Sequence, residues 1–520
     1  MSPTAPNAPI PSLPPFAASA ESAGLLRSAL DAAGFDDAGL AKAIGATDQA
    51  EARKVRIGLR VFRTSAGRPI DTLLRLFLLG MPVDEAAAER ALAPLGVDRG
   101  VREGLLARTD AGLMARVQIL CRGGVLMATD RAPRAGTQLS GIPENFVMGI
   151  GASTLTVAHM LPSALLDRPI TRALDLGCGA GYLALALAKG GLQHVAAVDL
   201  NPRCLEYARF NAHLNRLPNV WTGQGDLFAP ARSFPALGPG FDLIASNPPF
   251  VITPGKSYVF RDAGLGSDSL TGRVIREAPA CLAEGGLSIF MTNWVQPKGQ
   301  DWKDHLRSWF TGTGCDALVL DNGPRSPDEY ASFWIAHTEG DDVEAEGQMI
   351  RTWVEEYERQ NIEMIHGGII IMRKRTAPTN WVEFDTTPDT MPTRAGNHVL
   401  RCIAANDLLQ EPDLDSLVLV PAPDLRLTHE LVPTPEARGG WTIDESRLRL
   451  IEGLAPAGGA DPVVVRFVGL LNGVKTLGAI IAELAQEFEA SPDKLGPSAR
   501  GVARKMLQRG MLIPASAKGR

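Results

Sequence analysis

The chain has 520 residues, more than one ordinary hydrophobic core accommodates, and this length predicts two to four domains. Its apolar content of 45% and charged content of 21% are typical of a globular protein, and no apolar run approaches the ~18 residues that a membrane span needs. The net charge of −6 argues against a dedicated nucleic-acid-binding protein, although local patches can override the sum.

The six cysteines lie scattered along the chain, with no C-x-x-C pair and no spacing typical of metal ligands. We therefore expect reduced, buried thiols in a cytoplasmic protein. The same scatter gives no indication of an iron–sulfur cluster or of another metal site.

The N-terminal part begins with a segment rich in proline and alanine. The first fifteen residues hold six prolines and no Lys or Arg, which argues against a secretory signal and predicts a disordered tail over residues 1–20. Residues 21–108 have the pattern of short helices, and two apolar stretches within 113–128 predict a hairpin. Helices followed by a hairpin indicate a winged-helix-like N-terminal domain over 21–135.

The central part, residues 140–376, alternates apolar strands with helices. Candidate strands are residues 172–176, 195–199, 219–222, 242–246, 287–292, 316–320 and 368–373. Strands that alternate with helices predict a parallel α/β sheet.

The C-terminal part divides into two expected pieces. Residues 377–460 are rich in Pro, Asp and Thr and predict a small β-rich connector. In residues 461–520, Thr476 can cap a helix with one apolar face, and a second helix leads into the short strand 511–513. This order indicates a winged-helix-like C-terminal domain.

A glycine-rich turn, Gly177-Cys178-Gly179-Ala180-Gly181, follows the strand 172–176 and precedes a helix. Glycines allow the backbone to approach a ligand closely, and the helix presents free N–H groups. By itself such a turn also suits NAD or FAD, or serves only as a bend in the chain. Asp199 ends the next strand, where its carboxylate can accept both hydroxyls of a ribose.

A second acidic position follows the third strand, in Gly225-Asp226-Leu227-Phe228. Asp226 can accept from an adenine amino group while Leu227 or Phe228 covers the ring, although Asp226 also suits a helix cap. The acidic positions Asp175, Asp199 and Asp226 resemble class I S-adenosylmethionine-dependent methyltransferases in order and spacing. The resemblance implies a Rossmann-like seven-stranded core, S-adenosylmethionine as cofactor, and Asp175 with Gly177, Gly179 and Gly181 facing its methionine part.

Asn247-Pro248-Pro249-Phe250 directly follows the fourth strand, at the carboxyl edge where open α/β folds bind ligands. An amide or aromatic amine nitrogen is a poor nucleophile because its lone pair is delocalised. The Asn247 side-chain oxygen and the Pro248 carbonyl can hold its two hydrogens and aim the lone pair at a methyl group. Phe250 offers a face for a planar acceptor, and the loop has no cysteine for carbon methylation.

The tract Ser246–Gly255, SNPPFVITPG, resembles the corresponding region of the HemK/PrmC-type glutamine methyltransferases. RsmC-type nucleobase methyltransferases share Asn-Pro-Pro-Phe, but there a His often follows where this chain has Val251. The resemblance covers roughly residues 150–335. An acidic insert at 339–346 and the added terminal domains depart from the simple family plan.

The leading hypothesis is therefore N-methylation of a protein glutamine side chain in a translation factor or ribosomal protein. The first alternative is methylation of an exocyclic amine, guanine N2 or adenine N6, in rRNA, tRNA or DNA. The second alternative is a catalytically silent scaffold that binds partners, against which the complete Asp175, Asp199 and Asn247–Phe250 set argues.

Two basic patches are candidates for contact with nucleic acid, and both also suit ordinary solvated surface. The first lies within residues 53–68, where six Lys or Arg residues face only Glu51. The second lies within 494–520, which has no acidic residue. Tyr258 and Arg261 are candidates for lining the substrate entrance, or for simple loop packing.

Overall fold

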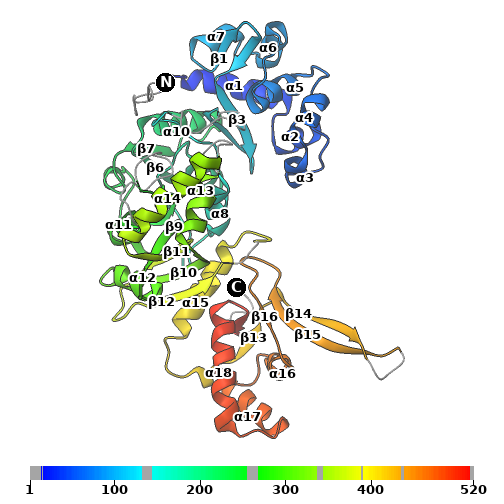
Figure 1. The fold of residues 1–520 in the computed structure, drawn as a ribbon, viewed down its shortest axis with the longest axis vertical. Coiled ribbons are helices and arrows are strands. Elements are labelled where there is room, and N and C mark those ends of the chain that lie inside the picture. The colour runs from blue at the N-terminus through cyan, green and yellow to red at the C-terminus, as the bar shows by residue number, and fades with distance from the viewer. Residues whose placement is uncertain are drawn as a thin grey trace. The chain divides into compact units, whose positions relative to one another are not determined.

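The computed structural model describes residues 13, 16–131, 143–254, 268–336, 343–387, 391–434 and 439–515. The chain forms two compact units (Figure 1). Unit 1 comprises residues 1–158 and 170–384, and unit 2 comprises residues 159–169 and 385–520. Within the described ranges, no helix has the length and apolar character needed to cross a membrane.

Unit 1 begins with short helices, as predicted. Ser19 accepts from the N–H of Ser22 at the start of the first helix, and Gly34, with φ of 68°, ends it. The helices are α1 (Ala20–Ala33), α2 (Asp37–Ala43), α3 (Gln49–Lys54), α4 (Ile57–Arg63), α5 (Pro69–Leu73), α6 (Glu85–Leu92) and α7 (Val97–Arg102). Two hairpins follow, β1 (Leu106–Thr109) with β2 (Gly112–Ala115) and β3 (Val117–Arg122) with β4 (Val125–Asp130). The predicted hairpin is confirmed, and the winged-helix likeness stays a prediction.

A single eight-stranded sheet forms the core of unit 1, in the order β12-β10-β11-β9-β8-β5-β6-β7. Its strands are β5 (Arg172–Leu176), β6 (His194–Asp199), β7 (Val220–Gln224), β8 (Phe241–Ser246), β9 (Leu282–Pro297), β10 (Cys315–Arg325), β11 (Ile362–Lys374) and β12 (Val382–Thr386). All the predicted strands are present, and the predicted Rossmann-like α/β class is confirmed. The buried cluster around Leu174, Ile244 and Phe290 packs this sheet against its helices.

Two details of the sheet correct the prediction. The strand β11 runs antiparallel to both β9 and β10, so the sheet is mixed rather than parallel. An apolar strand pattern carries no information about direction, which the connections set. The strand β12 lies in the predicted connector but pairs with β10 at the sheet edge.

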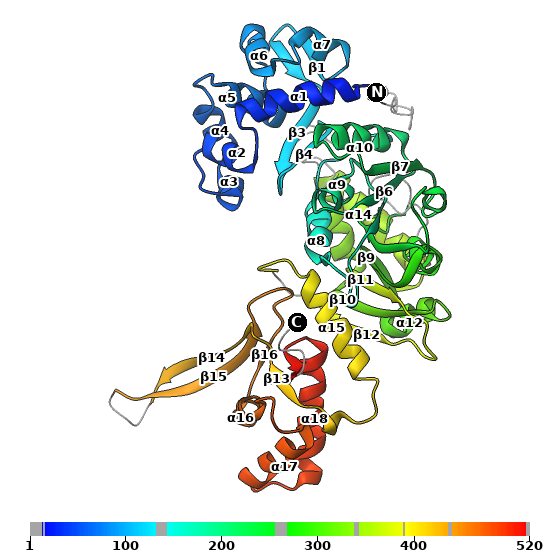
Figure 2. The same cartoon turned by 180° about the vertical axis from the view of Figure 1, so that it is seen from behind.

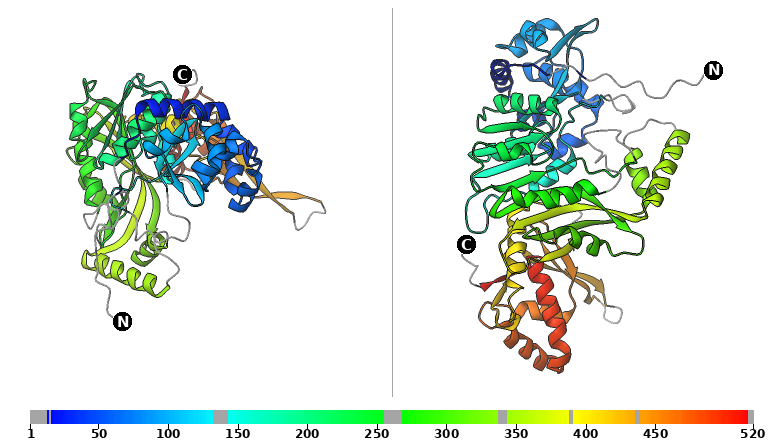
Figure 3. Two further views of the ribbon diagram at one scale, coloured as in Figure 1. Left: turned by 90° about the horizontal axis from the view of Figure 1, so that it is seen from above. Right: turned by 90° about the vertical axis from the view of Figure 1, so that its left-hand side faces the viewer.

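The helices of this core are α8 (Ala152–Met160), α9 (Tyr182–Lys189), α10 (Pro202–Leu214), α11 (Ser269–Glu277), α12 (Trp302–Phe310), α13 (Pro327–Ile335) and α14 (Val343–Arg359). The pale green α13 and α14 connect β10 to β11 (Figure 3). They include the described part of the predicted acidic insert, whose residues 339–342 lie outside the described ranges.

The N-terminal helices and hairpins are fastened to α10, the helix that follows β6. Asp130 at the end of β4 accepts from the Tyr207 hydroxyl at 2.7 Å, from Arg203 Nε at 3.0 Å and from the Val147 N–H at 2.9 Å. The ring of Phe16 stacks on Tyr207 with centroids 4.1 Å apart. The prediction of a disordered tail over 1–20 is therefore wrong at Phe16, whose ring is buried against α10.

Unit 2 joins the predicted connector and C-terminal domain around one apolar core. Its elements are α15 (Gly396–Leu408), β13 (Leu419–Pro421), β14 (Leu425–Pro433), β15 (Trp441–Leu450), β16 (Ala457–Gly459), α16 (Pro462–Leu470), α17 (Leu477–Glu487), α18 (Pro492–Gln508) and β17 (Leu512–Pro514). Leu419 and Leu448 share a buried cluster with Ile480 and Leu512, and β13 pairs with β17. The predicted boundary at 460/461 is therefore wrong, since both sides contribute to one core.

Two further features of unit 2 bear on the prediction. The predicted connector contains the thirteen-residue helix α15, which was not expected there. Thr476 accepts from the Ala479 N–H and caps α17, as predicted. The strands β14 and β15 form a long hairpin that extends from the other elements of this unit (Figure 2).

Candidate functional site

Four neighbouring parallel strands end at the segments that contain the predicted site residues. In the sheet order β8-β5-β6-β7, these strands lead into Asn247, Gly177, Asp199 and Gly225 respectively. Because the carboxyl ends of parallel strands lie at the same edge, the structure gathers all of these segments on one side of the sheet.

The glycine turn is tied to the end of β6. The N–H groups of Gly177 and Cys178 both donate to the Val198 carbonyl at 2.9 Å. Gly181 has φ of 91°, and a Cβ there would lie 3.1 Å from the Cβ of Ala208 on α10. A Cβ on Gly179, by contrast, would meet no atom within 4 Å. Glycine is therefore required at 181 by packing and conformation, whereas space is open beside Gly179.

Asp199 lies next to this turn with acceptor capacity left over. Its carboxylate accepts from the Gly179 N–H at 2.8 Å and from the Asn201 N–H at 2.9 Å. Burial raises the pKa of Asp199 above its ordinary value. An ionised carboxylate offers about four lone-pair positions, so it can still accept from the hydroxyl groups of a ligand.

Asp175 is buried beneath the same edge. It is 1% exposed, and its carboxylate accepts from the Ala184 N–H at 2.9 Å, which ties β5 to the first turn of α9. Burial, with a further contribution from the negative charge of Asp199, raises the pKa of Asp175 to about 7. The observed contact is structural, and a direct role toward a ligand stays a prediction.

The raised pKa of Asp175 predicts a pH-dependent stability. The folded protein binds this proton more tightly than the unfolded chain does, so the stabilisation is complete below pH ~4 and is lost as the pH rises through about 7. Relative to Asp175→Asn, the wild-type free energy of unfolding should fall by up to ~1.4 kcal/mol per pH unit in this window. Urea unfolding followed by tryptophan fluorescence measures it, since every tryptophan except Trp441 lies in unit 1. A difference that is constant with pH would contradict the raised pKa.

The segment after β7 is more open. Asp226 has a side chain 59% exposed and forms an ion pair with Arg273 of α11 at 2.8 Å. Leu227 is half-buried and has φ of 43°, whereas Phe228 is completely buried in the core of the sheet. Leu227 thus remains a candidate for covering a ring, and Phe228 is excluded. Arg273 beside Asp226 was not predicted.

The Asn247 side chain is held at one end and free at the other. Its Nδ2 donates to Ser153 Oγ at 3.1 Å and to Thr154 Oγ1 at 3.0 Å, both on α8. Its Oδ1 is buried and has no hydrogen-bond partner within the described part of the chain. A buried acceptor without a donor costs ~1–3 kcal/mol, which a ligand N–H at this position would offset.

The loop after β8 that contains Asn247–Phe250, which we call the acceptor loop, borders the turn of Gly177–Gly181. A Cβ on Gly177 would lie 3.8 Å from the Cα of Pro248. The glycine turn, predicted to bind the cofactor, and the acceptor loop are therefore neighbours in space.

The far side of the acceptor loop is anchored by the helices between β10 and β11. The Ile252 N–H donates to Tyr330 Oη at 3.1 Å, and the Tyr357 hydroxyl donates to the Ile252 carbonyl at 2.6 Å. Phe250 is half-buried and packs edge-on against Trp334, with ring centroids 6.0 Å apart. Neither tyrosine was predicted, and together they limit the movement of the loop.

The remaining predictions concern the substrate entrance, the end of the second basic patch, the cysteines and a metal site. Tyr258, Arg261 and residues 516–520 lie outside the described ranges. All six cysteines are buried as free thiols outside any disulfide of the described residues, as expected. In the described ranges no group of three His, Cys, Asp or Glu side chains is placed to hold a metal ion.

The two basic patches differ in their partners. In the second patch, Arg500 pairs with Asp415 at 2.6 Å, and Arg509 and Lys505 pair with Asp385 at 2.8 and 3.3 Å. In the first, Arg68 pairs with Asp71. Six exposed residues in and between α3 and α4 form what we call the α4 patch: Arg53, Lys54, Arg56, Ile57, Phe62 and Arg63.

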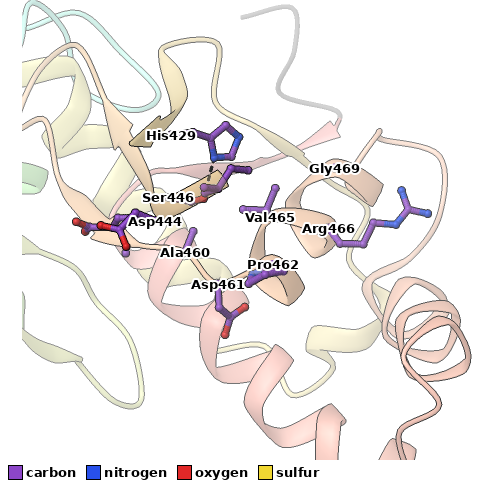
Figure 4. Close-up of a pocket in the computed structure, with 12 residues that line it drawn as sticks. His429, Asp444, Ser446, Ala460, Asp461, Pro462, Val465, Arg466 and Gly469 are labelled. Atoms are coloured by element: carbon purple, nitrogen blue, oxygen red, sulfur yellow. Dashed lines mark hydrogen bonds between the residues drawn. The ribbon is translucent and has the colours of Figure 1, made fainter. Parts of the chain in front are cut away.

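A separate hollow of about 850 Å³ lies in unit 2, between the β14–β15 hairpin and α16 (Figure 4). Its lining includes His429, Ile443, Asp461 and Val465. None of the predicted site residues belongs to this unit, so the hollow is distinct from the edge described above.

Known proteins resemble this chain in the region that forms the carboxyl edge of the sheet. Residues 152–312 match the family described as methyltransferase small domain, and residues 32–116 match a domain of unknown function, DUF7059. The ribosomal RNA small subunit methyltransferase C of Chromohalobacter salexigens is 33% identical over 172 residues, which are 33% of this chain and 46% of the relative.

Two further relatives belong to the glutamine-modifying class by name. The putative protein N5-glutamine methyltransferase of Methanocaldococcus jannaschii is 30% identical over 135 residues, covering 25% of this chain and 64% of the relative. The release factor glutamine methyltransferase of Vibrio cholerae is 29% identical over 187 residues, covering 30% and 63%. The chain thus spans about half to two thirds of the length of these relatives. The match of residues 152–312 to a methyltransferase small domain, together with these relatives, confirms the predicted resemblance to S-adenosylmethionine-dependent methyltransferases.

Proposed function

We propose that the chain transfers a methyl group from S-adenosylmethionine to a planar –NH2 nitrogen of a macromolecule. The observation that carries this proposal is the buried, unpartnered Oδ1 of Asn247 at the carboxyl edge of the sheet. This oxygen and the Pro248 carbonyl would accept the two hydrogens of the acceptor nitrogen. Accepting both hydrogens favours a pyramidal nitrogen whose lone pair can attack, so the rate gain is one of positioning and electrostatics.

The cofactor supplies an electrophilic methyl group, and the residues of the edge suit its binding. The turn of Gly177, Gly179 and Gly181 has open space at Gly179, and Asp199 has acceptor capacity for ribose hydroxyls. We assign Asp226 and Leu227 to the adenine end. The nitrogen–methyl bond forms as the sulfur–methyl bond breaks, and the nitrogen then loses one proton to solvent.

The leading substrate is a protein glutamine side chain in the translation machinery. The tract Ser246–Gly255 favours it, and so do the names of two relatives, which act on glutamine. We place the reaction in the cytoplasm, with the six buried thiols outside disulfides as support.

The second candidate is an exocyclic amine of RNA, and the α4 patch favours it. Its Lys and Arg side chains are exposed, and Ile57 and Phe62 beside them are 69% and 72% exposed. Cations interleaved with an aromatic side chain suit phosphates and unstacked bases. The ion pairs within 494–515 make the second patch a weaker candidate.

Removing the charges of the α4 patch separates these two candidates. If RNA is the substrate, the change of Arg53, Lys54, Arg56 and Arg63 to Gln should weaken binding of total ribosomal RNA by ~10-fold or more at 50 mM salt and flatten its salt dependence. The matched control is Lys494→Gln with Arg504→Gln, which removes cations elsewhere. Equal binding by wild type and the patch variant would reject the RNA candidate.

Cofactor binding tests the enzymatic proposal itself. Calorimetry on the full chain should show one site for S-adenosylhomocysteine. A chain that is folded by circular dichroism yet binds neither this product nor S-adenosylmethionine would support the scaffold alternative and overturn the proposal.

A further inference from the structure

Two hydroxyl groups at the start of α8 contact the Asn247 side chain opposite to its acceptor oxygen. Ser153 Oγ lies 3.1 Å and Thr154 Oγ1 lies 3.0 Å from Asn247 Nδ2. Both side chains are half-buried, and 93 or more residues separate them from Asn247 along the chain. The contact therefore joins a helix that precedes the sheet to the loop after β8.

In this arrangement the amide nitrogen of Asn247 faces the two hydroxyls and the amide oxygen does not. A carboxamide is planar and its NH2 group has two hydrogens, so two acceptors occupy the nitrogen fully. Both hydroxyls accept in this arrangement, and the oxygen is left as the group without a partner. The proposed reaction needs an acceptor at this position, not a second donor.

We propose that Ser153 and Thr154 are positioning residues that hold the Asn247 carboxamide so that Oδ1 receives an N–H of the methyl acceptor. They act through Asn247 and do not contact the reacting atoms. This inference rests on the proposed function, because it assigns a purpose to the orientation of Asn247 only if that oxygen holds the acceptor nitrogen.

A purely structural role would be a link between α8 and the acceptor loop. The same helix supplies a matched comparison, because the Thr156 hydroxyl donates to the Ala152 carbonyl within α8 at 3.1 Å. Thr156→Val removes a hydroxyl from the same helix without touching Asn247. It should leave both activity and cofactor affinity within about twofold of wild type.

The test compares Ser153→Ala, Thr154→Val and their combination with Thr156→Val in the full chain. The measurement is the initial rate of tritium transfer from methyl-labelled S-adenosylmethionine into macromolecules from cells that lack this chain. Loss of one ~1 kcal/mol hydrogen bond predicts a rate about fivefold lower for each single change, and about 30-fold lower for the combination. Affinity for S-adenosylhomocysteine should stay within about twofold.

Two further arms separate positioning from folding. Ser153→Thr with Thr154→Ser retains both hydroxyls and should keep the rate within about threefold of wild type. In an Asn247→Ala background, removing both hydroxyls should lower the residual rate by less than about twofold, because the group that they orient is gone.

Each outcome addresses one claim. Full activity of the Ser153→Ala, Thr154→Val combination, with Asn247→Ala inactive, overturns the inference and leaves the proposed function standing. A further large loss in the Asn247→Ala background shows a structural role and also overturns it. Wild-type activity of Asn247→Ala itself overturns the proposed function.

Discussion

Asn247→Ala should lower the rate of methyl transfer by ~10²–10³-fold, the loss typical of removing one aligned hydrogen-bonding group at a reacting centre. The reason is the missing acceptor, because the acceptor nitrogen is then held only by the Pro248 carbonyl. Cofactor affinity should stay within a few-fold, since Asn247 lies on the loop after β8 and not on the glycine turn after β5. The measurements are label transfer and calorimetry with S-adenosylhomocysteine.

Stability supplies the control for this change. The change removes the unpartnered Oδ1, which is unfavourable where it lies, and also the two hydrogen bonds that Nδ2 donates. These two effects oppose each other, so the free energy of unfolding should stay within ~2 kcal/mol of wild type. A variant that is inactive and also unstable would show that Asn247 acts mainly in folding. A variant as active as wild type would remove Asn247 from the mechanism.

Asp199→Asn should weaken the binding of S-adenosylmethionine by ~10–100-fold. The variant keeps the size of the side chain but replaces one charged acceptor oxygen by a donor, and a hydrogen bond to a charged group contributes ~1.5–3 kcal/mol. The Gly179 and Asn201 N–H groups that point at this carboxylate would also lose part of their interaction. Calorimetry measures the affinity directly.

The matched control is Asp301→Asn. Asp301 is exposed and caps α12 by accepting from the Lys303 N–H, so it changes the same charge away from the glycine turn. Its affinity for the cofactor should equal that of wild type. If both variants bind equally well, the assignment of Asp199 to the cofactor is wrong.

The parts of the site that are local in sequence could be predicted. The strand 172–176 was placed at its observed bounds, and the segments after four strands were placed at one edge because parallel order alone brings their ends together. Motif residues such as Gly177 and Asn247 are recognisable since their chemistry depends on spacing within a few residues.

The partners of these motifs could not be predicted in the same way. Ser153, Thr154 and Tyr357 reach the acceptor loop from about 90 to 105 residues away, and nothing in their local sequence marks the contact. Tertiary packing alone decides such pairs. The antiparallel direction of β11 was missed for a related reason, because an apolar strand pattern is the same in either direction.

Unit 2 shows where composition is a weak guide. The abundance of Pro, Asp and Thr suggested a connector, yet Val399, Cys402 and Ile403 share the buried face of α15 at helical spacing. The pattern was present in the sequence, and composition averaged over 84 residues, from 377 to 460, obscured it. The boundary predicted at 460/461 is wrong for the same reason, because residues on both sides of it share one core.

The central claim is tested most directly by identifying the methylated atom. Full-length protein is incubated with methyl-labelled S-adenosylmethionine and macromolecules from cells that lack it, and the labelled protein and RNA are separated, digested and analysed by mass spectrometry. The account predicts label on a planar nitrogen, foremost the side-chain nitrogen of glutamine, and a labelling rate ~10²–10³-fold lower with Asn247→Ala. Label on carbon or oxygen, or a labelling rate in Asn247→Ala equal to that of wild type, would contradict it.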